Sequence, residues 1–511
     1  MELNINIKKL GTTNEFFSFY KYLVDESGAR THALLESVAE DSHEMLFSFI
    51  GINPDLVLQV NGSDLHVLEV STETGEKFKA AAGSSITEKK EYEMPFEDDM
   101  PMNLAAIDQL KDFFPITRSA MPELFPRKVF SGGLLGYVGY DVVAPYVGYA
   151  PSQASRELFP DVLMGLFTTV LAYSHATKTL YQITNTKGEY EGDAVIARRF
   201  DAFKQLAARA RSDIPAFDKA SLLKQDTGFT TNTSLDRWTS MIEKTKEHLA
   251  AGDIMQAVIS RKMISDADAD PLDVYQALRV LNPSAYMFFL SFGGMNGGAI
   301  RLIGSSPEAL VTKDRTRLNT VPIAGTRRRG RDPEDEKRME QELLHSEKEL
   351  AEHVMLVDLA RNDMARVSVP GSVDTYELFR LKKFPNVMHM ISKIRSVSYE
   401  NPFDVLKAMF PAGTVSGAPK KRAMEIIHQL EVEDRGPYAG CAGYVSFTGD
   451  MDMAISIRTM FNHGHKFVAQ AGAGIVADSK PQEEYLETDN KLKGVLSSIN
   501  LSRMIAEQRK R

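Results

Sequence analysis

The strand-like segments of this chain are grouped rather than alternating with helix-like ones, and this grouping constrains its possible folds most. The strand-like runs are rich in aromatic and β-branched residues and lie at 46–60, 166–183 and 292–326. The helix-like segments lie at 188–211, 334–363 and 483–508. Strands that cluster apart from long helices favour an α+β fold over an alternating parallel one.

A polar stretch with scattered turn residues divides the chain in two. It spans residues 212–232 and contains no clear apolar periodicity. We therefore predict an N-terminal domain over 1–225 and a second domain over 226–511.

Composition excludes several classes of protein. The net charge of -9 argues against a general nucleic-acid binder. No apolar run reaches the roughly 18 residues of a membrane span, and the first residues lack the apolar core of a signal peptide. The single cysteine, Cys441, allows no disulfide framework and no cysteine metal cluster. We expect a cytoplasmic protein that binds neither nucleic acid nor a membrane.

The stretch FPAGTVSGAPKKR (410–422) looks at first like a phosphate-binding loop, but its spacing is wrong. In such a loop the lysine directly follows the second glycine, whereas Ala418 and Pro419 separate Gly417 from Lys420 here. Pro419 suits the first turn of a following helix. Three basic residues then crowd a helix end that already carries partial positive charge. Either an anion compensates them, or they form a solvated basic face.

Two glutamate pairs have helical spacing. Glu349 and Glu352 are three residues apart in one helix-like segment, and Glu484 and Glu487 are three apart in another. Residues at this spacing are neighbours on a helix surface. If the two pairs face each other, they form an oxygen-rich site of the kind that Mg²⁺ prefers. The alternative is two solvated acidic helix faces.

A set of short motifs follows in order along residues 234–511. They are GDIMQAVISR (252–261), IGSSPEAL (303–310), VPIAGTRRRG (321–330), KELAEHVMLVDLARND (348–363), NVMHMIS (386–392), FPAGTVSGAPK (410–420), AISIRT (454–459), AGAGIVADS (471–479) and EYLETDNK (484–491). With LLES (34–37), FSFIG (47–51) and GGLLGYVGYD (132–141), the set resembles the chorismate-utilising enzymes, and among them the synthase subunits (component I) of anthranilate synthases. The resemblance implies two large, mainly antiparallel sheets packed face to face with helices outside.

The resemblance also implies a pocket for chorismate, which is a dicarboxylate. Arginine suits a carboxylate because its planar fork binds both oxygens, and glycine lets the main chain approach a ligand closely. The implied substrate-binding residues are Gly325, Thr326 and Thr414, Tyr438 and Arg458 at the enolpyruvyl carboxylate, and Gly472, Ala473 and Gly474 through backbone N–H groups. Glu352 and Glu487 would ligate Mg²⁺ directly, and Glu349 and Glu484 would stand behind them through water.

Two residues are implied to act in the chemistry. Glu308 lies where related enzymes carry the acid that protonates the departing C4 hydroxyl, and burial could keep it protonated. A carboxylate that caps a turn is the alternative. His389 is the implied acid–base for the later elimination of pyruvate, since the pKa of histidine lies near neutral pH. Without the motif, a core histidine would be the alternative.

Two other positions indicate which nucleophile attacks C2. Related enzymes that use water carry a lysine base where this chain has Gln256, and many that use lysine covalently carry it where this chain has Ala324. With both lysines absent, ammonia remains, which favours anthranilate as product. Aminodeoxychorismate synthase component I is the nearest alternative, and a non-catalytic binding protein on the same fold is another.

The chain contains no sign of its own ammonia source. Glutamine amidotransferases hydrolyse glutamine with a cysteine nucleophile, and Cys441 lies in a strand-like run rather than at a nucleophile turn. We therefore expect a separate glutamine amidotransferase subunit (component II), or use of free ammonium.

Two segments resemble the tryptophan-binding segments of feedback-regulated relatives. They are LLES (34–37) and NPSAYMFFL (282–290). The implied residues are Glu36 and Ser37, the backbone around Ala285, Tyr286 and Met287, and Phe288 and Tyr444. Most relatives have proline where this chain has Ala285, so inhibition by tryptophan could be weak. A plain core strand is the alternative.

Overall fold

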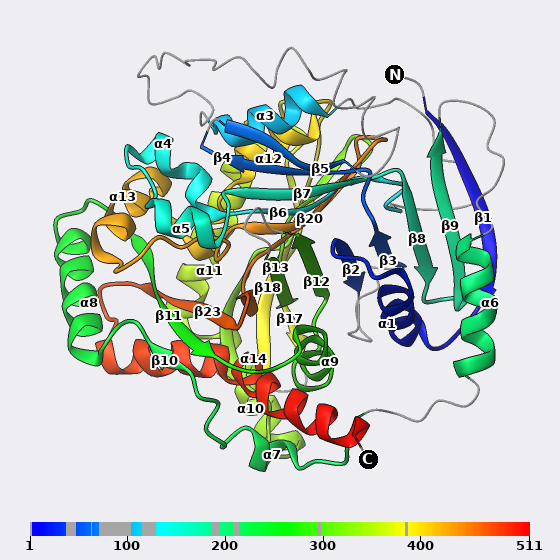
Figure 1. The fold of residues 1–511 in the computed structure, drawn as a ribbon. Coiled ribbons are helices and arrows are strands. Elements are labelled where there is room, and N and C mark those ends of the chain that lie inside the picture. The colour runs from blue at the N-terminus through cyan, green and yellow to red at the C-terminus, as the bar shows by residue number, and fades with distance from the viewer. Residues whose placement is uncertain are drawn as a thin grey trace.

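The computed structural model describes the greater part of the 511 residues. The described ranges are 3–36, 47–62, 64–70, 104–114, 129–186, 195–207, 214–293, 298–383 and 387–510. They form two large antiparallel sheets with helices around them (Figure 1).

The first sheet has twelve strands within the described residues, and their order in space mixes early and late parts of the chain. Along the sheet they are β1 (Asn4–Thr12), β9 (Thr179–Thr186), β8 (Thr169–Ser174), β3 (Phe47–Ile52), β2 (His32–Glu36), β12 (Tyr286–Gly293), β13 (Ala299–Ser306), β22 (Thr459–His463), β23 (Lys466–Ile475), β11 (Gln256–Asp266) and β10 (Thr230–Thr231), with β19 (Gly417–Ala418) also paired to β11.

The second sheet has eleven strands in the same part of the chain. Along the sheet they are β16 (Ile323–Arg328), β18 (Val387–Val397), β15 (Arg317–Thr320), β14 (Ala309–Asp314), β21 (Met451–Ile455), β20 (Cys441–Ser446), β6 (Gly133–Val138), β7 (Val162–Phe167), β4 (Leu56–Asn61) and β5 (Asp64–Val70), with β17 (Asp374–Lys383) also paired to β18.

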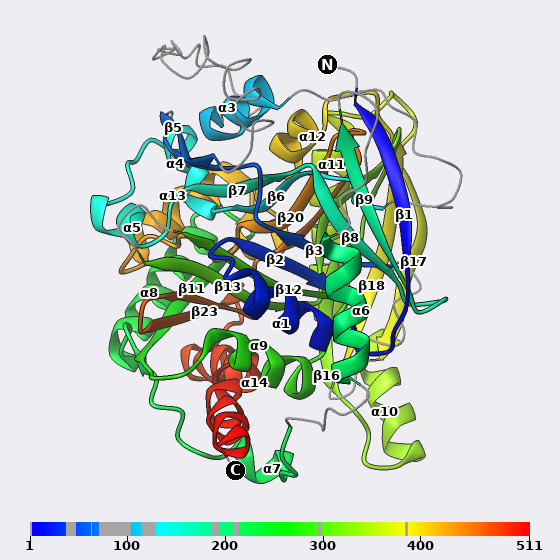
Figure 2. The same ribbon diagram turned by 45° about the vertical axis from the view of Figure 1, so that its right-hand side comes forward.

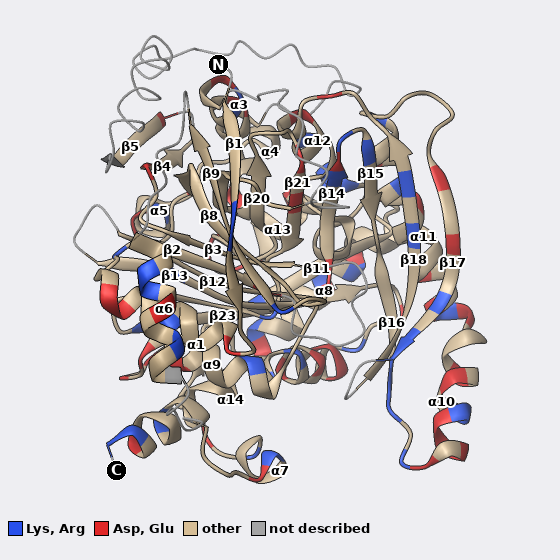
Figure 3. Cartoon of the chain, turned by 90° about the vertical axis from the view of Figure 1, so that its right-hand side faces the viewer, with Lys and Arg blue, Asp and Glu red and all other residues tan. Residues whose placement is uncertain are grey.

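The helices lie outside the sheets, and charged residues gather on them, as on α10, while the strands are mostly uncharged (Figure 3). They are α1 (Phe16–Ser27), α3 (Ala105–Phe113), the 3₁₀ turn η1 (Tyr140–Val143), α4 (Ala144–Val147), α5 (Gln153–Leu158), α6 (Val195–Ala207), α7 (Lys219–Leu222), α8 (Leu235–Ala250), α9 (Pro271–Leu281), α10 (Pro333–Leu344), α11 (Glu347–Ala365), α12 (Pro402–Met409), the 3₁₀ turn η2 (Gly413–Val415), α13 (Lys420–Leu430) and α14 (Pro481–Arg509). No helix of the described residues is long and apolar enough to cross a membrane.

Strand β12 shows how the two main cores arise. Because successive side chains of a strand point to opposite faces, Phe288 and Leu290 enter the core shared by the two sheets, together with Leu135 and Tyr444 of the second sheet. Met287 enters a second core, where α1, α9 and α14 cover the outer face of the first sheet (Figure 2). Burial of both faces of this sheet therefore fixes its position between helices and the second sheet.

The predicted α+β fold, with two antiparallel sheets face to face, is confirmed. The strand-like runs 46–60 and 166–183 are strands, and the C-terminal helix is α14. In the helix-like segment 188–211, the described part forms α6, and the remainder lies outside the described residues. Both sheets take strands from both sides of residue 225, and the domain boundary at that residue stays a prediction.

The prediction of one long helix over 334–363 is wrong, because two helices occupy this segment. Helix α10 ends at Leu344, with His345 as its C-terminal cap. Ser346 is the N-terminal cap of α11, and its hydroxyl accepts a hydrogen bond from the backbone N–H of Glu349 at 3.4 Å. Serine is a preferred N-terminal cap, so this residue was the signal for a break that apolar periodicity did not show.

Candidate active site

The basic start of α13 is compensated by carboxylates of the protein itself. The Nζ of Lys420 lies 2.6 Å from Oδ2 of Asp363, and both side chains are nearly buried. Arg422 pairs with Asp253 at 3.0 Å and with Glu425 at 2.9 Å. Pro419 is the residue before the helix rather than part of its first turn. These ion pairs join α13 to α11 and to the turn before β11. They compensate the positive charges of Lys420 and Arg422 at the start of the helix.

Glu308 lies in the short turn between β13 and β14, and it is 6% exposed. Burial raises the pKa of its carboxyl to about 8, and the nearby Thr414 hydroxyl and Ile323 N–H only partly offset this. Burial disfavours the charged form of a carboxyl group. Glu308 is therefore protonated at neutral pH and can act as a general acid.

His389 lies on β18, directly opposite Thr326 of β16. Its Nδ1 is 3.2 Å from the carbonyl oxygen of Gly325 and 3.0 Å from the Thr326 hydroxyl. Because a carbonyl only accepts, Nδ1 carries the hydrogen in the bond to Gly325, and Nε2 is then the basic nitrogen. Burial lowers the pKa of His389 to about 4, so the ring is neutral at pH 7 and can accept a proton.

Tyr438 and Arg458 come together from two turns of the chain. Burial raises the pKa of Tyr438 to about 12 and lowers that of Arg458 to about 10. A Cβ on Gly472 would lie 3.0 Å from the Tyr438 hydroxyl, so glycine at this position lets the ring reach the β23 backbone. The predicted tyrosine, arginine and glycine thus lie at one place, as expected for a site that receives a carboxylate.

At the glycine-rich end of β23, successive residues face opposite sides of the sheet. A Cβ on Gly474 would lie 2.3 Å from Nε2 of Gln256, so a larger residue there would have to displace that side chain. Ala473 instead points into an apolar cluster with Trp238 of α8 and Ile427 of α13. The side chain of Ala473 therefore faces away from Gly472 and Gly474, and only its backbone can take part in a site on their side.

The two glutamate pairs approach each other from α11 and α14. Burial raises the pKa of Glu352, and the negative charges of Glu349 and Glu487 raise it further. Burial and the charge of Glu487 likewise raise the pKa of Glu484. The charge of Glu487 therefore acts on both Glu352 and Glu484, and the metal site that the four glutamates would form stays a prediction.

These carboxylates are partly neutralised by cations of the protein. Arg327 lies 2.8 Å from Glu349, and Lys491 lies 2.6 Å from Glu487. Within the described ranges, no group of three or more Asp, Glu, His or Cys side chains has the close arrangement of a metal site. The oxygen donors suit a hard cation such as Mg²⁺, and Glu349 and Glu487 would have to turn from their present cations to reach it.

Lys491 is a residue of this site to which the sequence analysis assigned no role. Its Nζ also donates to the carbonyl oxygen of Gly472 at 2.8 Å. Burial raises the pKa of Glu308 and Glu352, and the charge of Lys491 offsets part of this rise; burial lowers the pKa of His389, and the same charge adds a little to that shift. Its place four residues after Glu487, where side chains on one helix meet, was the signal that could have found it.

The two predicted amino-acid-binding segments are neighbouring strands, but their side chains separate. Met287 pairs with Glu36 and Phe288 with Leu35. The buried carboxylate of Glu36 binds Arg279 at 2.8 Å on the helix-covered face. Phe288 and Tyr444 lie in the core between the sheets. The structure therefore does not bring Glu36 to Phe288 and Tyr444 as predicted, because the strand pleat directs them to opposite faces.

The other predicted tryptophan-binding residues are Ser37, Ala285 and Tyr286. Ser37 lies outside the described residues. Ala285 is buried just before β12, and Tyr286 begins the strand opposite Ser306.

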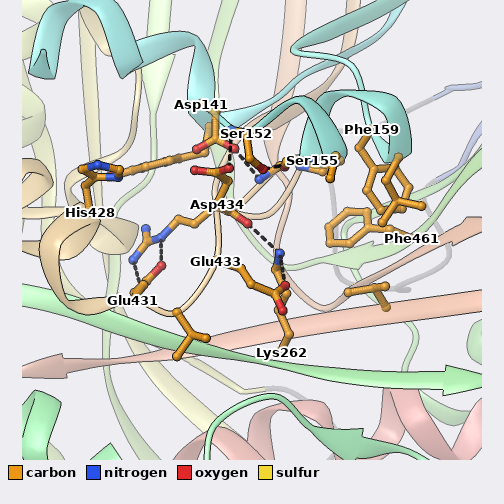
Figure 4. A pocket seen from close by; sticks show the side chains of 18 of the residues that line it. Asp141, Ser152, Ser155, Phe159, Lys262, His428, Glu431, Glu433, Asp434 and Phe461 are labelled. Carbon is orange, nitrogen blue, oxygen red and sulfur yellow. Dashed lines mark hydrogen bonds and ion pairs between the residues drawn. The ribbon is translucent and has the colours of Figure 1, made fainter. Parts of the chain in front are cut away.

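A cavity of about 530 Å³ is lined by residues other than those of this site (Figure 4). Its wall includes the carboxylates of Asp141 and Asp434 and the rings of Phe159 and Phe461. None of the predicted catalytic, substrate-binding or metal-binding residues lines it.

Comparisons with known proteins find related sequences and a related structure. The family described as chorismate binding enzyme matches residues 45–497. Anthranilate synthase component 1 of Aquifex aeolicus is 41% identical over 78% of this chain and 81% of its own length. The protein of the same name from Acinetobacter calcoaceticus is 36% identical over 97% of this chain and 94% of its own. The crystal structure of anthranilate synthase component I from Streptococcus pneumoniae superposes with a TM-score of 0.66 at 31% identity, covering 90% of this chain and 94% of that one.

Proposed function

This chain belongs to the family of chorismate binding enzymes, and from that premise we propose that it is the synthase subunit of an anthranilate synthase. It would combine chorismate with ammonia and release anthranilate, pyruvate and water. The observation that carries the proposal is the position of two groups against β16: the carboxyl of the buried Glu308 accepts from the Ile323 N–H, and Nδ1 of His389 donates to the Gly325 carbonyl oxygen at 3.2 Å.

The first step would be the amination of C2. Ammonia forms the new C–N bond, the ring double bonds shift, and the C4 hydroxyl leaves as water after taking a proton from Glu308. Hydroxide is a poor leaving group, so a carboxyl with a pKa of about 8 supplies what this step needs. The Thr414 hydroxyl beside Glu308 would position the substrate there.

The second step would be the elimination of pyruvate. The C2 proton is removed, the C–O bond to the enolpyruvyl group breaks, and that group leaves with a proton to become pyruvate as the ring aromatises. The neutral ring of His389, oriented by the Gly325 carbonyl, would accept the C2 proton at Nε2. Arg458 and Tyr438 would hold the enolpyruvyl carboxylate.

Mg²⁺ fits the proposed site through Glu352 and Glu487, with Glu349 and Glu484 behind them. Burial and, after it, the charges of Glu349 and Glu487 raise the pKa of Glu352, and a cation bound there would stabilise its charged form. When bound, the ion would neutralise the ring carboxylate of the substrate. Release of Glu487 from Lys491 would accompany its binding.

The ammonia would come from a separate glutamine amidotransferase subunit. The relatives are named component 1, and burial raises the pKa of the Cys441 thiol. A buried thiol with a raised pKa is a poor thiolate nucleophile. We propose a heteromeric complex, with free ammonium as a substitute donor.

Inhibition by tryptophan is a further part of the proposal. The pairing of β2 with β12 joins the two segments that resemble the amino-acid-binding segments of regulated relatives. Ser37→Arg is expected to abolish inhibition and to leave turnover unchanged. Wild-type protein that is insensitive to tryptophan would contradict this part alone.

The proposed activity can be tested by fluorescence. The purified chain is mixed with chorismate, Mg²⁺ and excess ammonium at alkaline pH, where ammonia is abundant. A Mg²⁺-dependent rise in anthranilate fluorescence is expected. Chorismate consumption without that rise would contradict it and would favour the aminodeoxychorismate synthase reaction instead.

A further inference from the structure

Arg435 is a buried cation that lines the cavity of about 530 Å³ and also contacts Val415 and the ring of Tyr438. It is 2% exposed. Its Nε lies 2.9 Å from Oε2 of Glu431, and its second terminal nitrogen lies 2.6 Å from Oε1, so the ion pair is bidentate. Glu431 is held in turn by the backbone N–H of Ser260 at 2.8 Å and its hydroxyl at 2.7 Å. The charge of Arg435 is therefore already compensated, and the side chain is fixed.

The remaining contacts of Arg435 reach two backbone segments of the proposed site. One terminal nitrogen donates to the carbonyl oxygen of Val415 at 2.8 Å, next to Thr414 in the 410–420 loop. The other donates to the carbonyl oxygen of Val258 in β11 at 2.6 Å. The side chain of Arg435 thus links the 410–420 loop to strand β11 of the first sheet.

The guanidinium of Arg435 also lies over the rings of two tyrosines. Its centre is 4.5 Å from the ring centre of Tyr140 and 5.6 Å from that of Tyr438. The next residue, Gly436, also contacts the N-terminal half of the chain, since its N–H donates to Oδ2 of Asp141 at 2.6 Å. The N-terminal half of the chain therefore buttresses the segment that carries Tyr438.

We propose that Arg435 is a positioning residue that holds Tyr438 and the 410–420 loop in the geometry that receives the enolpyruvyl carboxylate. The inference rests on the proposed function, and Arg435 itself touches no substrate. Arginine is needed because its planar fork makes the bidentate pair, both carbonyl bonds and the ring contacts together. Lysine keeps the charge but cannot make this set.

The test compares Arg435→Lys with Arg156→Lys in the otherwise intact chain. Arg156 also pairs with a buried carboxylate, that of Asp161 at 3.0 Å, but touches none of the proposed site residues. For Arg435→Lys we expect the KM for chorismate to rise by about tenfold or more, the scale of one lost charge-assisted hydrogen bond, with a smaller fall in kcat. Arg156→Lys should keep the wild-type KM. An unchanged KM in folded Arg435→Lys would overturn the proposal.

A second variant keeps the test decisive if Arg435→Lys does not fold. Glu431→Gln preserves the shape of the partner but removes its charge, and we expect a KM about two- to fivefold higher at nearly constant kcat. An unchanged KM in folded Glu431→Gln overturns the proposal in that case.

A double-mutant cycle separates positioning from general loss of stability. If Arg435 acts through Tyr438, then Arg435→Lys should raise KM at least about threefold less in a Tyr438→Phe background than in wild type. Fully additive effects would overturn the action through Tyr438. Wild-type chain that makes no anthranilate would instead contradict the proposed function, so the two failures are distinguishable.

Discussion

The proposed catalytic site and the β2–β12 strand pair differ in how well motifs locate side chains. At the catalytic site, Glu308 and Arg458 lie between strands, and His389 lies opposite Thr326, next to the irregularity of β16 at Gly325. In the strand pair, Glu36 and Phe288 lie on adjacent strands but on opposite faces. Motif order therefore predicts which segments meet, whereas the strand pleat decides which side chains do.

The largest effect is expected at His389. His389→Gln should lower anthranilate formation about 10²- to 10⁴-fold, the usual share of a general base, while chorismate is still consumed and the aminated intermediate accumulates. Mass analysis of the products checks this. His345→Gln, at the exposed end of α10, is the control and should behave as wild type. Normal anthranilate yield from His389→Gln would remove the acid–base role.

Glu308 should give the next largest effect. Glu308→Gln is expected to slow chorismate consumption about 10²-fold, since the amide cannot donate the proton. A general acid works only while it is protonated. The wild-type rate, divided by the concentration of free ammonia at each pH, should therefore fall as the pH rises through about 8. The decisive comparison is the pH profile of the two proteins. A profile flat through that range in wild type would contradict the assignment.

The glutamate cluster should show its effect in metal affinity. Glu352→Gln should raise the Mg²⁺ concentration for half-maximal activity about 10- to 100-fold, as for other weakened metal sites. Direct titration with Mn²⁺ followed by electron paramagnetic resonance provides a readout without turnover. Glu347→Gln, exposed on the same helix, is the matched control. Equal Mn²⁺ affinity in both variants would exclude Glu352 as a ligand.

The smallest effects on activity are expected in the strand pair. Glu36→Gln should lower the free energy of unfolding by about 1–3 kcal/mol, because it weakens a buried ion pair, and should change the tryptophan concentration for half inhibition less than about twofold. Phe288→Leu, on the opposite face, should weaken inhibition more than it changes stability. Chemical denaturation and inhibition curves measure both. Strong loss of inhibition in Glu36→Gln alone would reverse the assignment of faces.

Much of the fold could be predicted because the strand and helix patterns are strong over long segments. The break between α10 and α11 was missed because the helical pattern continues across it, although Ser346 marks it. Lys491 was missed because a lysine near glutamates is common on helix surfaces, and only the structure shows that its charge reaches Glu308 and His389. Such long-range meetings depend on tertiary packing, which local pattern does not contain.

The central claim is that Glu308 and His389 form one site that joins ammonia to chorismate. The most direct measurement uses ¹⁵N-ammonium with the purified chain, chorismate and Mg²⁺, and identifies the products by mass spectrometry. The account predicts ¹⁵N-labelled anthranilate and pyruvate in equal amounts from wild type, and a labelled product that retains the enolpyruvyl group from His389→Gln. Unlabelled hydroxylated product, or labelled anthranilate from both proteins at equal rates, would contradict it.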